Sequence, residues 1–331
     1  MDLGSTDVPP LNPRVWCLTT GEAGLRQQAR GLARELSPEF EERVVRVGRL
    51  MGLAPPSLFR LTLAGVHPLE GKLSPPWPDV LVSCGRRAGL AAMAIRRKSK
   101  APIVTIHIQA PSVPAAFDLV VAMPHDRLEG ENVICVDTAL HGVRATTLQA
   151  AAALSDLRFA ELPRPWTGVL LGGATARTPF TVEDAQRLAA GLDVLRARTG
   201  GSLLITPSRR TPPGVIAALS AHFAQDASIF FWDGSGANPY LSILAMADAI
   251  AVTSDSISMI SEAMATTADL YVFEVAGGGR HQNFLQSIFK QGLIARLGDT
   301  APRKRATGID ATPSVAAIAR EMMRQKLSAT T

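Results

Sequence analysis

Aromatic residues are scarce in this sequence, and charged residues are fewer than in an average globular protein. Phe, Trp and Tyr make up 5% of the 331 residues, and Asp, Glu, Lys and Arg make up 19%. Proteins that bind single-stranded nucleic acid stack bases on aromatic side chains set among basic ones. The basic segments 86–100 and 302–305 contain no aromatic residue. We therefore expect no nucleic-acid partner.

Cysteine is equally scarce. Cys17, Cys84 and Cys135 lie far apart, are odd in number and stand in apolar runs, which does not suit a disulfide framework. The sequence also lacks HExxH, a Cys/His cluster and a DxD placed like a metal site. We expect three buried thiols in a reducing compartment, no metal and no cofactor.

Long apolar segments and targeting signals are missing as well. The N-terminal stretch MDLGSTDVPPLNP has no basic region followed by an apolar one, so we expect no signal peptide. No segment reaches the roughly 18 uncharged apolar residues of a membrane-spanning helix. We expect a cytoplasmic protein. Its net charge of +5 favours anionic partners such as nucleotide phosphates or acidic lipid, although solvated helix faces are the simpler explanation of each basic cluster.

What the sequence does contain is an alternation of short apolar runs and amphipathic segments. In the first half, the runs predict strands at residues 14–18, 43–47, 79–83, 102–108, 117–122 and 132–136. Apolar residues at three-to-four spacing predict helices, most clearly at 22–37 and 86–98. Strands that are apolar on both faces are typical of a parallel sheet covered by helices on both sides. The pattern predicts a doubly wound α/β domain.

The alternation restarts after the proline-bearing segment 161–166. The second half is predicted to hold strands at 167–172, 202–207, 228–232, 249–253 and 270–274, and helices near 181–199, 212–223, 239–247, 256–266 and 280–290. At roughly 100–200 residues per domain, we place Rossmann-like domains at 1–160 and 161–331. A terminal amphipathic helix at 313–327 could pack on either domain. Ligands of such folds bind outside the carboxyl ends of the strands, which implies a central cleft between the domains.

Polar residues follow the first strand of each predicted domain. The loop 19–24, TTGEAG, offers glycines and a helix start to an anion, although Glu22 could simply be a helix cap. In the second domain, Gly172 and Gly173 end a strand, and paired glycines let a phosphate approach backbone amides. A capping box at 181–184 accounts for the polar residues further along this loop without a ligand.

The strand that ends near residue 207 is followed by a second polar loop, TPSRRTPP. Ser208, Arg209 and Arg210 lie where the strand ends. The arginine fork suits a bidentate phosphate contact. A surface loop would tolerate the same residues, but their position at a strand end favours a phosphate site.

The third polar loop is the most crowded. Residues 253–262, TSDSISMISE, follow the apolar run DAIAV. A helix cap explains one or two of Ser254, Asp255 and Ser256, but not the whole set. Glu262 lies further into the predicted helix, where its carboxylate could accept hydrogen bonds from two ribose hydroxyls. An exposed helix glutamate is the alternative.

The segment 238–284 resembles the donor-binding half of GT-B glycosyltransferases. It is similar in order and spacing to bacterial enzymes that add N-acetylglucosamine to the lipid-linked peptidoglycan precursor. The resemblance implies that Glu262 binds the nucleotide ribose. It also implies donor contacts from Arg280, Gln282 and Asn283 in the loop GRHQNF. The domain 161–331 would then be the donor side and 1–160 the acceptor side.

A second resemblance covers nearly the whole chain and points to the bacterial branch of the Elm-type mitochondrial-fission family. The motifs that carry it are GEAGLRQQARGLA, HIQAP, FDLVVAMPHDRLEGENVI, ALHGV, TPSRRTPP, TSDSISMISEA and GRHQNF. Plant members are linked to mitochondrial fission, and bacterial members are often labelled nucleoside-diphosphate-sugar epimerases. The chain departs from this family at HIQAPSVP, where asparagine and arginine commonly follow the glutamine.

A GT-B transferase needs no metal, because positive groups and helix N-termini stabilise the leaving nucleoside diphosphate. An inverting enzyme also needs a base, for which Glu22, His125 and Asp126 are candidates. His125 could equally be structural, and His107 is expected in the core. A hydrolase triad of nucleophile, base and acid is not supported, since the sequence contains no GxSxG elbow.

We therefore expect a nucleotide-sugar-binding GT-B protein, a glycosyltransferase of envelope glycan or lipopolysaccharide with a lipid-linked or glycan acceptor. The alternatives are a nucleoside-diphosphate-sugar 2-epimerase and a non-catalytic interaction protein on the same fold. The segment 49–65 mixes leucines with Arg49 and Arg60 and could contact the inner face of a membrane, although a buried helix explains it slightly better.

Overall fold

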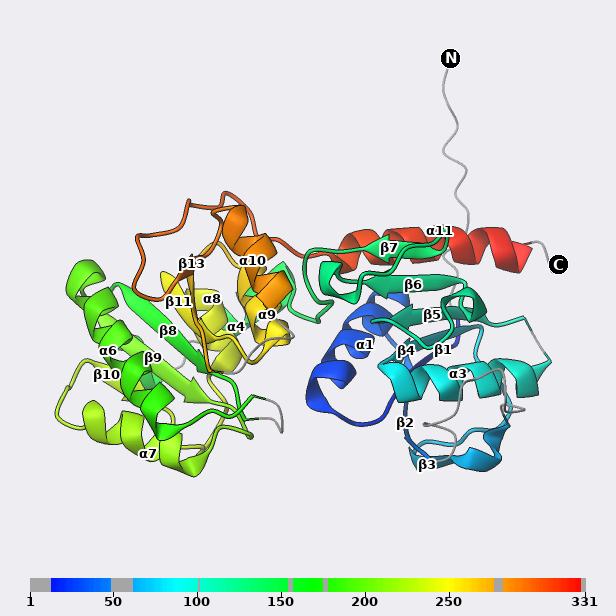
Figure 1. The fold of residues 1–331 in the computed structure, drawn as a ribbon, viewed down its shortest axis with the longest axis horizontal. Coiled ribbons are helices and arrows are strands. Elements are labelled where there is room, and N and C mark those ends of the chain that lie inside the picture. Colours follow the sequence, from blue (N-terminus) through cyan, green and yellow to red (C-terminus); the bar gives the residue numbers. More distant parts are fainter. Residues whose placement is uncertain are drawn as a thin grey trace, which may run out of the picture. The chain divides into compact units, whose positions relative to one another are not determined.

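The computed structural model describes residues 13–48, 62–100, 102–153, 157–174, 178–276 and 282–328. They form two compact units. Unit 1 contains the described residues up to Ala122, Asp126–Val136, and those from Thr312 onward. Unit 2 contains Met123–His125 and Asp137–Ala311. Each unit is a sheet with helices on both faces (Figure 1), so the prediction of two doubly wound α/β units is confirmed.

The sheet of unit 1 has seven strands among the described residues, in the order β3-β2-β1-β4-β5-β6-β7. They are β1 (Val15–Thr19), β2 (Glu41–Val47), β3 (Val66–Glu70), β4 (Val80–Cys84), β5 (Val104–Ile108), β6 (Leu119–Ala122) and β7 (Val133–Cys135). β3 runs antiparallel to β2, and the other neighbours pair in parallel. The strand order reverses between β1 and β4, which is where doubly wound sheets open for ligands.

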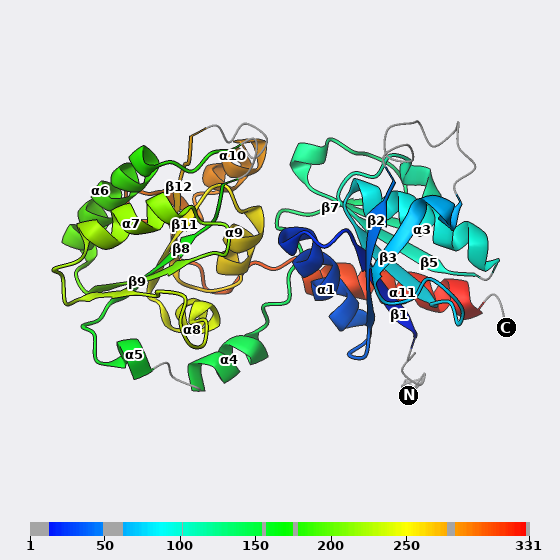
Figure 2. The same cartoon turned by 90° about the horizontal axis from the view of Figure 1, so that it is seen from below.

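Helices cover both faces of this sheet. In Figure 2, α3 (Arg86–Ser99) lies on one face, and α1 (Ala23–Leu36) and α11 (Thr312–Ser328) lie on the other. The described part of this unit also contains two short 3-10 turns, η1 (Leu63–Gly65) and η2 (Pro114–Ala116), while a third, η3 (Pro124–Asp126), lies at the boundary with unit 2. The apolar sides of β1 and β4 meet α3 through Trp16, Leu81, Ala91 and Ile95, all buried in one core cluster. Burial of these side chains is what holds α3 to the sheet.

His107 on β5 lies in this core, as expected. It is fully buried, its Nδ1 lies 2.8 Å from Ser83 Oγ, and its ring packs on Phe117. Burial lowers the pKa of His107 to about 3, so the ring is neutral at ordinary pH. Gly89 of α3 passes directly over it: a Cβ there would lie 2.8 Å from His107 Cε1. The histidine is a packing residue of unit 1.

The sheet of unit 2 has six parallel strands among the described residues, in the order β10-β9-β8-β11-β12-β13. They are β8 (Trp166–Leu171), β9 (Ser202–Pro207), β10 (Ile229–Phe231), β11 (Ala249–Thr253), β12 (Asp269–Phe273) and β13 (Ala295–Arg296). The helices are α4 (Ala145–Ala153), α5 (Leu157–Ala160), α6 (Val182–Thr199), α7 (Pro213–His222), α8 (Tyr240–Met246), α9 (Ile257–Met264) and α10 (Gln282–Lys290).

The two faces of this sheet carry different helices. Figure 2 shows α6 and α7 on one face and α8 on the other, with α4 beside α8. Leu188 and Leu192 of α6 and Leu219 of α7 pack on the strands in one buried cluster. On the opposite face, a Cβ at Gly168 of β8 would lie 2.4 Å from Ile243 Cγ2, so glycine lets α8 lie close to the strand. The expected capping box, Thr181 with Asp184, starts α6.

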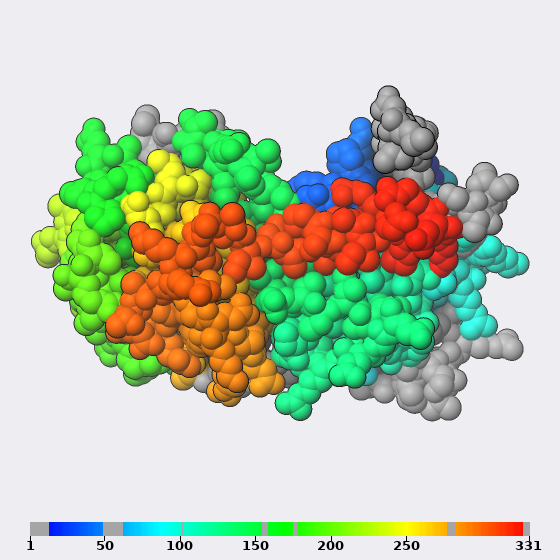
Figure 3. All heavy atoms as spheres, turned by 90° about the horizontal axis from the view of Figure 1, so that it is seen from above, coloured from blue at the N-terminus to red at the C-terminus, as the bar shows by residue number. Residues whose placement is uncertain are grey.

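The compact units divide the chain at residue 137 rather than near 160, and α11 belongs to unit 1. Residues between 137 and 160 join unit 2 because α4 packs on α8. α11 packs on α1, and Lys326 pairs with Asp118 at the start of β6. The outward side of α11 is exposed along unit 1 in Figure 3. Glu321 and Arg324 of this helix form an ion pair with each other. Sequence periodicity identified this helix but could not choose its partner.

Some smaller expectations differ from the structure. Cys17 and Cys84 are buried, but Cys135 is exposed because β7 is an edge strand. β3 was not predicted, because VHPLE is short, contains Pro68 and pairs only at the sheet edge. Of segment 49–65, residues 49–61 lie outside the described part. No helix in the described ranges is both long and apolar enough to span a membrane.

The turn between α6 and β9 offers a test of the packing that positions β8 and β9. Gly200 and Gly201 both have φ of +73°, but only Gly201 is crowded: a Cβ there would lie 1.8 Å from the Pro165 carbonyl oxygen. Gly200→Ala should cost roughly 1–3 kcal/mol from its backbone conformation alone. Gly201→Ala should cost at least about 2 kcal/mol more, because backbone must move. Thermal unfolding of both variants measures the difference, and equal Tm values would contradict the close contact.

Candidate functional site

Three loops meet at the carboxyl edge of the sheet of unit 2. They follow β8, β9 and β11, which are neighbours in the order β9-β8-β11. The parallel arrangement places all three strand ends on the same edge, which is why residues distant in sequence become adjacent. Ser208 Oγ donates to the Gly172 carbonyl at 2.9 Å, and Gly173 N–H donates to Asp255 Oδ2 at 2.7 Å. Three of the predicted polar loops therefore form one cluster.

The glycine pair is the centre of this cluster. Gly172 N–H donates to Thr253 Oγ1 at 2.8 Å, so both amides that the sequence assigned to a phosphate have partners within the chain. A Cβ at Gly172 would lie 2.1 Å from Asp255 Oδ2, and one at Gly173 would lie 2.4 Å from the backbone of Arg210. Glycine is required at both positions because the neighbouring loops occupy the space of a side chain.

The loop after β9 presents its arginines to solvent. Ser208 N–H and Oγ both bond Thr211 Oγ1, and Thr211 Oγ1 donates to the Gly172 carbonyl. These bonds hold the backbone of the loop against β8. The side chains of Arg209 and Arg210 are exposed, and the structure gives neither a salt bridge among the described residues. Two exposed guanidinium groups thus belong to the loop whose backbone packs on Gly173, available to an anion.

Asp255 is a buried carboxylate in the middle of these loops. Asp255 is only 6% exposed, and within the described residues its Oδ1 has no hydrogen-bond partner. Burial raises the pKa of Asp255, while the Thr253 hydroxyl, the Gly173 amide and the charge of Arg210 act in the opposite direction. A buried carboxylate with an unsatisfied oxygen is costly, and such groups concentrate at functional sites.

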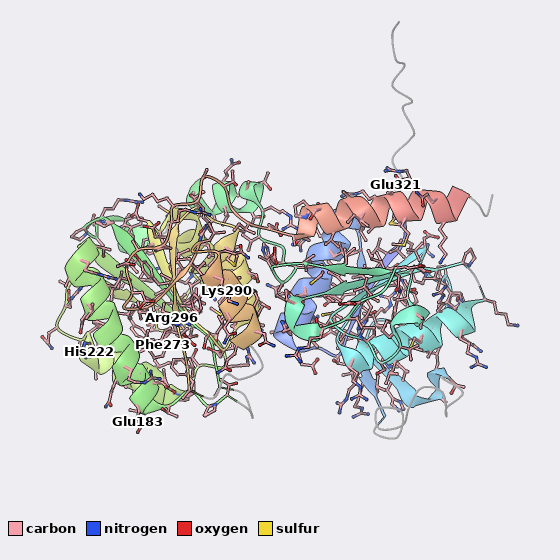
Figure 4. The ribbon with its side chains drawn as sticks, turned by 45° about the horizontal axis from the view of Figure 1, so that its top comes forward. Glu183, His222, Phe273, Lys290, Arg296 and Glu321 are labelled. Atoms are coloured by element: carbon pink, nitrogen blue, oxygen red, sulfur yellow. The ribbon has the colours of Figure 1, made fainter. Side chains whose placement is uncertain are left out.

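The serines around Asp255 have structural partners. Ser256 caps α9 through a hydrogen bond from Met259 N–H, as a capping serine is expected to do. Ser254 Oγ accepts from Val275 N–H at 3.0 Å, and Ser254 N–H donates to the carbonyl of Phe273, the last residue of β12 (Figure 4). Ser254 therefore ties the loop after β11 to the loop after β12.

Glu262 is buried rather than exposed. Its residue is 5% exposed, and Tyr240 at the start of α8 donates its hydroxyl to Glu262 Oε2. Burial raises the pKa of Glu262 to about 7, with the Tyr240 hydrogen bond acting against the rise. No salt bridge neutralises this carboxylate within the described residues. The exposed-glutamate alternative is excluded, and the carboxylate is poised between its protonated and ionised forms near neutral pH.

The ALHGV motif, residues 139–143, is hydrogen-bonded to α9. Ala139 N–H donates to Ser261 Oγ at 2.9 Å, next to Glu262 in the helix. The adjoining His141 is fully buried, with its Nε2 3.6 Å from Asp310 Oδ1, and Asp310 also pairs with Arg144 at 2.9 Å. These contacts fix the helix that carries Glu262 to two distant stretches of unit 2.

The predicted base candidates lie elsewhere in the fold. Glu22 is the exposed residue before α1 and accepts from Thr20 Oγ1 at 2.5 Å. His125 and Asp126 are half-buried in η3, just after β6. Glu22 and Asp126 both act electrostatically on Cys84, at the end of β4, and help burial to raise its pKa. These two carboxylates thus share the carboxyl edge of the unit 1 sheet. Their meeting with the donor-side residues in one active site stays a prediction.

The remaining predicted donor residues begin α10. Gln282 and Asn283 are its first two residues and both are exposed. Arg280 lies outside the described residues. Nowhere in the described ranges do three or more His, Cys, Asp or Glu side chains gather as a metal site would require.

Sequence reasoning missed the residues that complete the site. Tyr240, Thr253 and Thr211 each bond a predicted residue, but nothing in the sequence pairs positions so far apart. Tyr240 carried one usable signal, since it is one of only two tyrosines and begins a predicted helix. Thr253 and Thr211 look like ordinary strand-end residues, and only the sheet order brings them to Gly172.

Comparison with known proteins identifies a family and two related sequences. A family model described as Mitochondrial fission ELM1 matches residues 23–323. The mitochondrial fission protein ELM1 of Arabidopsis thaliana is 31% identical over 243 residues, which cover 66% of this chain but only 56% of the plant protein. An uncharacterized protein of Rickettsia prowazekii (strain Madrid E) is 25% identical over 326 residues, covering 86% of this chain and 90% of that protein.

Among solved structures, the chain is similar to a UDP-GlcNAc 2-epimerase from Methanocaldococcus jannaschii in complex with UDP-GlcNAc and UDP. The identity is 12%, the TM-score is 0.49, and the match covers 95% of this chain and 99% of that one.

The buried Glu262 makes stability depend on pH. Because its pKa is raised from 4.5 to about 7 in the folded state, the folded protein holds this proton more tightly than the unfolded chain does. Stability should therefore fall as pH rises from about 4.5 to 7, by roughly 3 kcal/mol in total, and level off above. Glu262→Gln removes this contribution, and Tyr240→Phe should extend the fall to higher pH. Thermal unfolding of wild type and both variants between pH 5 and 8 tests this, and parallel profiles for wild type and Glu262→Gln would contradict it.

Proposed function

Because the chain belongs to the mitochondrial fission ELM1 family and has a GT-B-like fold of two doubly wound units, we propose that it binds a nucleoside-diphosphate sugar and transfers the sugar without a metal. The transfer would serve the synthesis of a cell-envelope glycan or lipopolysaccharide. The nucleotide sugar is the substrate, and no other cofactor is proposed.

The observation that carries this proposal is the buried carboxylate of Glu262. Burying a carboxylate without an ion pair costs several kcal/mol of folding free energy, so such a group is expected where a function requires it. Its side-chain partner among the described residues is Tyr240, and α9, which carries it, begins directly after the strand-end loop that holds Asp255. Vicinal ribose hydroxyls are donors that a carboxylate can accept in pairs. This fit supports Glu262 as the group that accepts hydrogen bonds from the ribose hydroxyls.

The loop after β9 supplies the positive charge that a diphosphate needs. Arg209 and Arg210 are exposed in the loop that Ser208 bonds to the Gly172 carbonyl. Charge that develops on the leaving diphosphate would be stabilised by these guanidinium groups, as in other preorganised anion sites. Gln282 and Asn283 at the start of α10 would contact the sugar or its phosphates.

Transfer requires a base for the acceptor hydroxyl. The hydroxyl oxygen attacks the anomeric carbon, the bond to the diphosphate breaks, and the base takes the hydroxyl proton. We assign this role to one of His125, Asp126 and Glu22, which stand near strand ends of unit 1 or directly after β6. Substitution of the true base should abolish transfer and leave nucleotide binding intact, because the base does not touch the nucleotide.

The acceptor is proposed to be a lipid-linked or glycan hydroxyl at the cytoplasmic face of a membrane. The end of α3 supports such a location. Arg97 and Lys98 in its last turn and Lys100 after it are exposed cations on one stretch of unit 1. Anionic lipid attracts such residues by about 1 kcal/mol each.

A non-catalytic interaction role is the second candidate. It is favoured by the 31% identity to a plant protein named for mitochondrial fission. In that case the buried carboxylates would be retained for nucleotide binding alone, and turnover would be absent.

Calorimetric titration with UDP, GDP, CDP and dTDP and their sugars tests the donor site. We expect one nucleotide to bind, and Glu262→Ala and Arg209→Ala each to weaken it at least about tenfold, since each removes a charge-assisted hydrogen bond. Arg303→Ala is the matched control, because Arg303 is an exposed arginine of the same unit away from the strand ends. It should bind as wild type does.

The outcomes separate the candidates. Binding by a folded wild type that is lost in both site variants supports the donor site, and transfer to an acceptor then identifies the transferase. Release of an epimerised or free sugar with no acceptor would indicate an epimerase. Binding without turnover would indicate the interaction role. If no nucleotide bound to folded protein, the proposed function would be wrong.

A further inference from the structure

The position of the Asp255 carboxylate is unusual for a residue beside a phosphate site. Its Oδ2 accepts the Gly173 amide at 2.7 Å, and the carboxylate fills the space in which a Gly172 side chain would lie. Both glycines directly follow β8, and paired glycines are a place where an anion can approach backbone amides. The anion found at this place belongs to the chain itself.

The surroundings of Asp255 are those of an anion-binding site. From the loop after β8 it meets the Gly173 amide, from the end of β11 the Thr253 hydroxyl, and from the loop after β9 the charge of Arg210. Of these groups only Arg210 is charged, and Arg209 stands next to it, exposed to solvent. Backbone amides, a hydroxyl and arginines are the same donors that hold a phosphate.

We propose that Asp255 is a built-in occupant of the phosphate subsite, which a nucleotide's phosphate must displace from the Gly173 amide in order to bind. This inference rests on the proposed function and adds a determinant of affinity within its site. Two anions within one set of donors repel each other, so the carboxylate lowers the affinity for phosphate-bearing ligands.

A purely structural role does not explain why one oxygen of the Asp255 carboxylate lacks a hydrogen bond. If Asp255 only clasped the loops, both oxygens should be bonded, since an unsatisfied buried acceptor costs about 1–3 kcal/mol. Within the described residues Oδ1 has no partner. Nor does Asp255 cap α9, because Ser256 performs that task. The Gly173 amide and the Thr253 hydroxyl hold the carboxylate while Oδ1 stays unsatisfied, as expected of a group that a ligand can displace.

The proposal has a consequence for pH. Burial raises the pKa of Asp255, so protonation occurs at a higher pH than for an ordinary aspartate. A protonated Asp255 no longer repels a phosphate, and binding of phosphate-bearing ligands should strengthen as pH falls. Because Glu262 and the terminal phosphate of a free nucleoside diphosphate also titrate near neutral pH, the relevant quantity is the affinity of the nucleoside-diphosphate sugar divided by that of the nucleoside without phosphate, in which the ribose contact cancels.

The test compares Asp255→Asn and Asp255→Ser with wild type in the full chain. Asparagine keeps the shape and an amide-accepting oxygen but removes the charge, and serine removes the occupant. The probes are the nucleoside diphosphate found in the titration panel, its nucleoside, and inorganic pyrophosphate, at a fixed pH of about 7.5. We expect both variants to bind the diphosphate and pyrophosphate about tenfold more tightly than wild type and the nucleoside equally.

Each outcome decides the matter. Unchanged or weaker diphosphate binding by variants that unfold at the wild-type temperature would show that Asp255 is a clasp, and overturn the proposal. If both variants fail to fold, the wild-type ratio of nucleoside-diphosphate-sugar to nucleoside affinity between pH 5 and 8 replaces them, and a ratio that does not rise toward low pH overturns the proposal. Failure of every nucleotide to bind wild type and variants would instead remove the proposed function, and this inference with it.

Discussion

The arrangement of unit 2 depends on two residues without side chains at the end of β8. Gly172 and Gly173 allow the loops after β9 and β11 to touch the central strand of their group, with the Arg210 backbone over one glycine and the Asp255 carboxylate over the other. A single Cβ at either position would overlap its neighbour, at 2.4 Å or 2.1 Å. Ser208 and Thr211 donate hydrogen bonds to the Gly172 carbonyl, and Gly172 N–H donates to Thr253, which together hold the three strand ends against one another. The polar cluster exists because this close approach is sterically permitted.

Buried carboxylates with an ion pair and those without one have pKa values shifted in opposite directions. In unit 1, Glu42 is partly buried, and burial alone would raise its pKa, but ion pairs with Arg26 and Arg30 outweigh that effect and lower it. In unit 2, Asp255 and Glu262 are more deeply buried, form no salt bridge among the described residues, and have raised pKa values. The ion pairs of Glu42 compensate for its partial burial. Buried carboxylates without an ion pair, such as Asp255 and Glu262, reduce stability, and such groups concentrate at functional sites.

The sequence predicted most elements well because their periodicity is local. Apart from the edge strands β3 and β13, the strands of both sheets and the long helices are recognisable from apolar runs and three-to-four spacing, and the capping box at Thr181 from residues three apart. Features that depend on remote partners were missed or misplaced. The exposure of Cys135 follows from the edge position of β7, and the return of α11 to unit 1 follows from its packing on α1. Neither is encoded near the residue concerned.

The same distinction applies to the site. The sequence by itself determined that glycines, arginines, serines and carboxylates follow the strands of a doubly wound fold, because strand ends can be read from local pattern. Only the tertiary structure decided that Gly173 bonds Asp255 and that Glu262 is buried against Tyr240. The physical reason is that hydrogen-bond partners and burial are set by the lateral order of strands and the packing of helices. Segments tens of residues apart meet there, and the dielectric surroundings of each carboxylate are determined by that meeting.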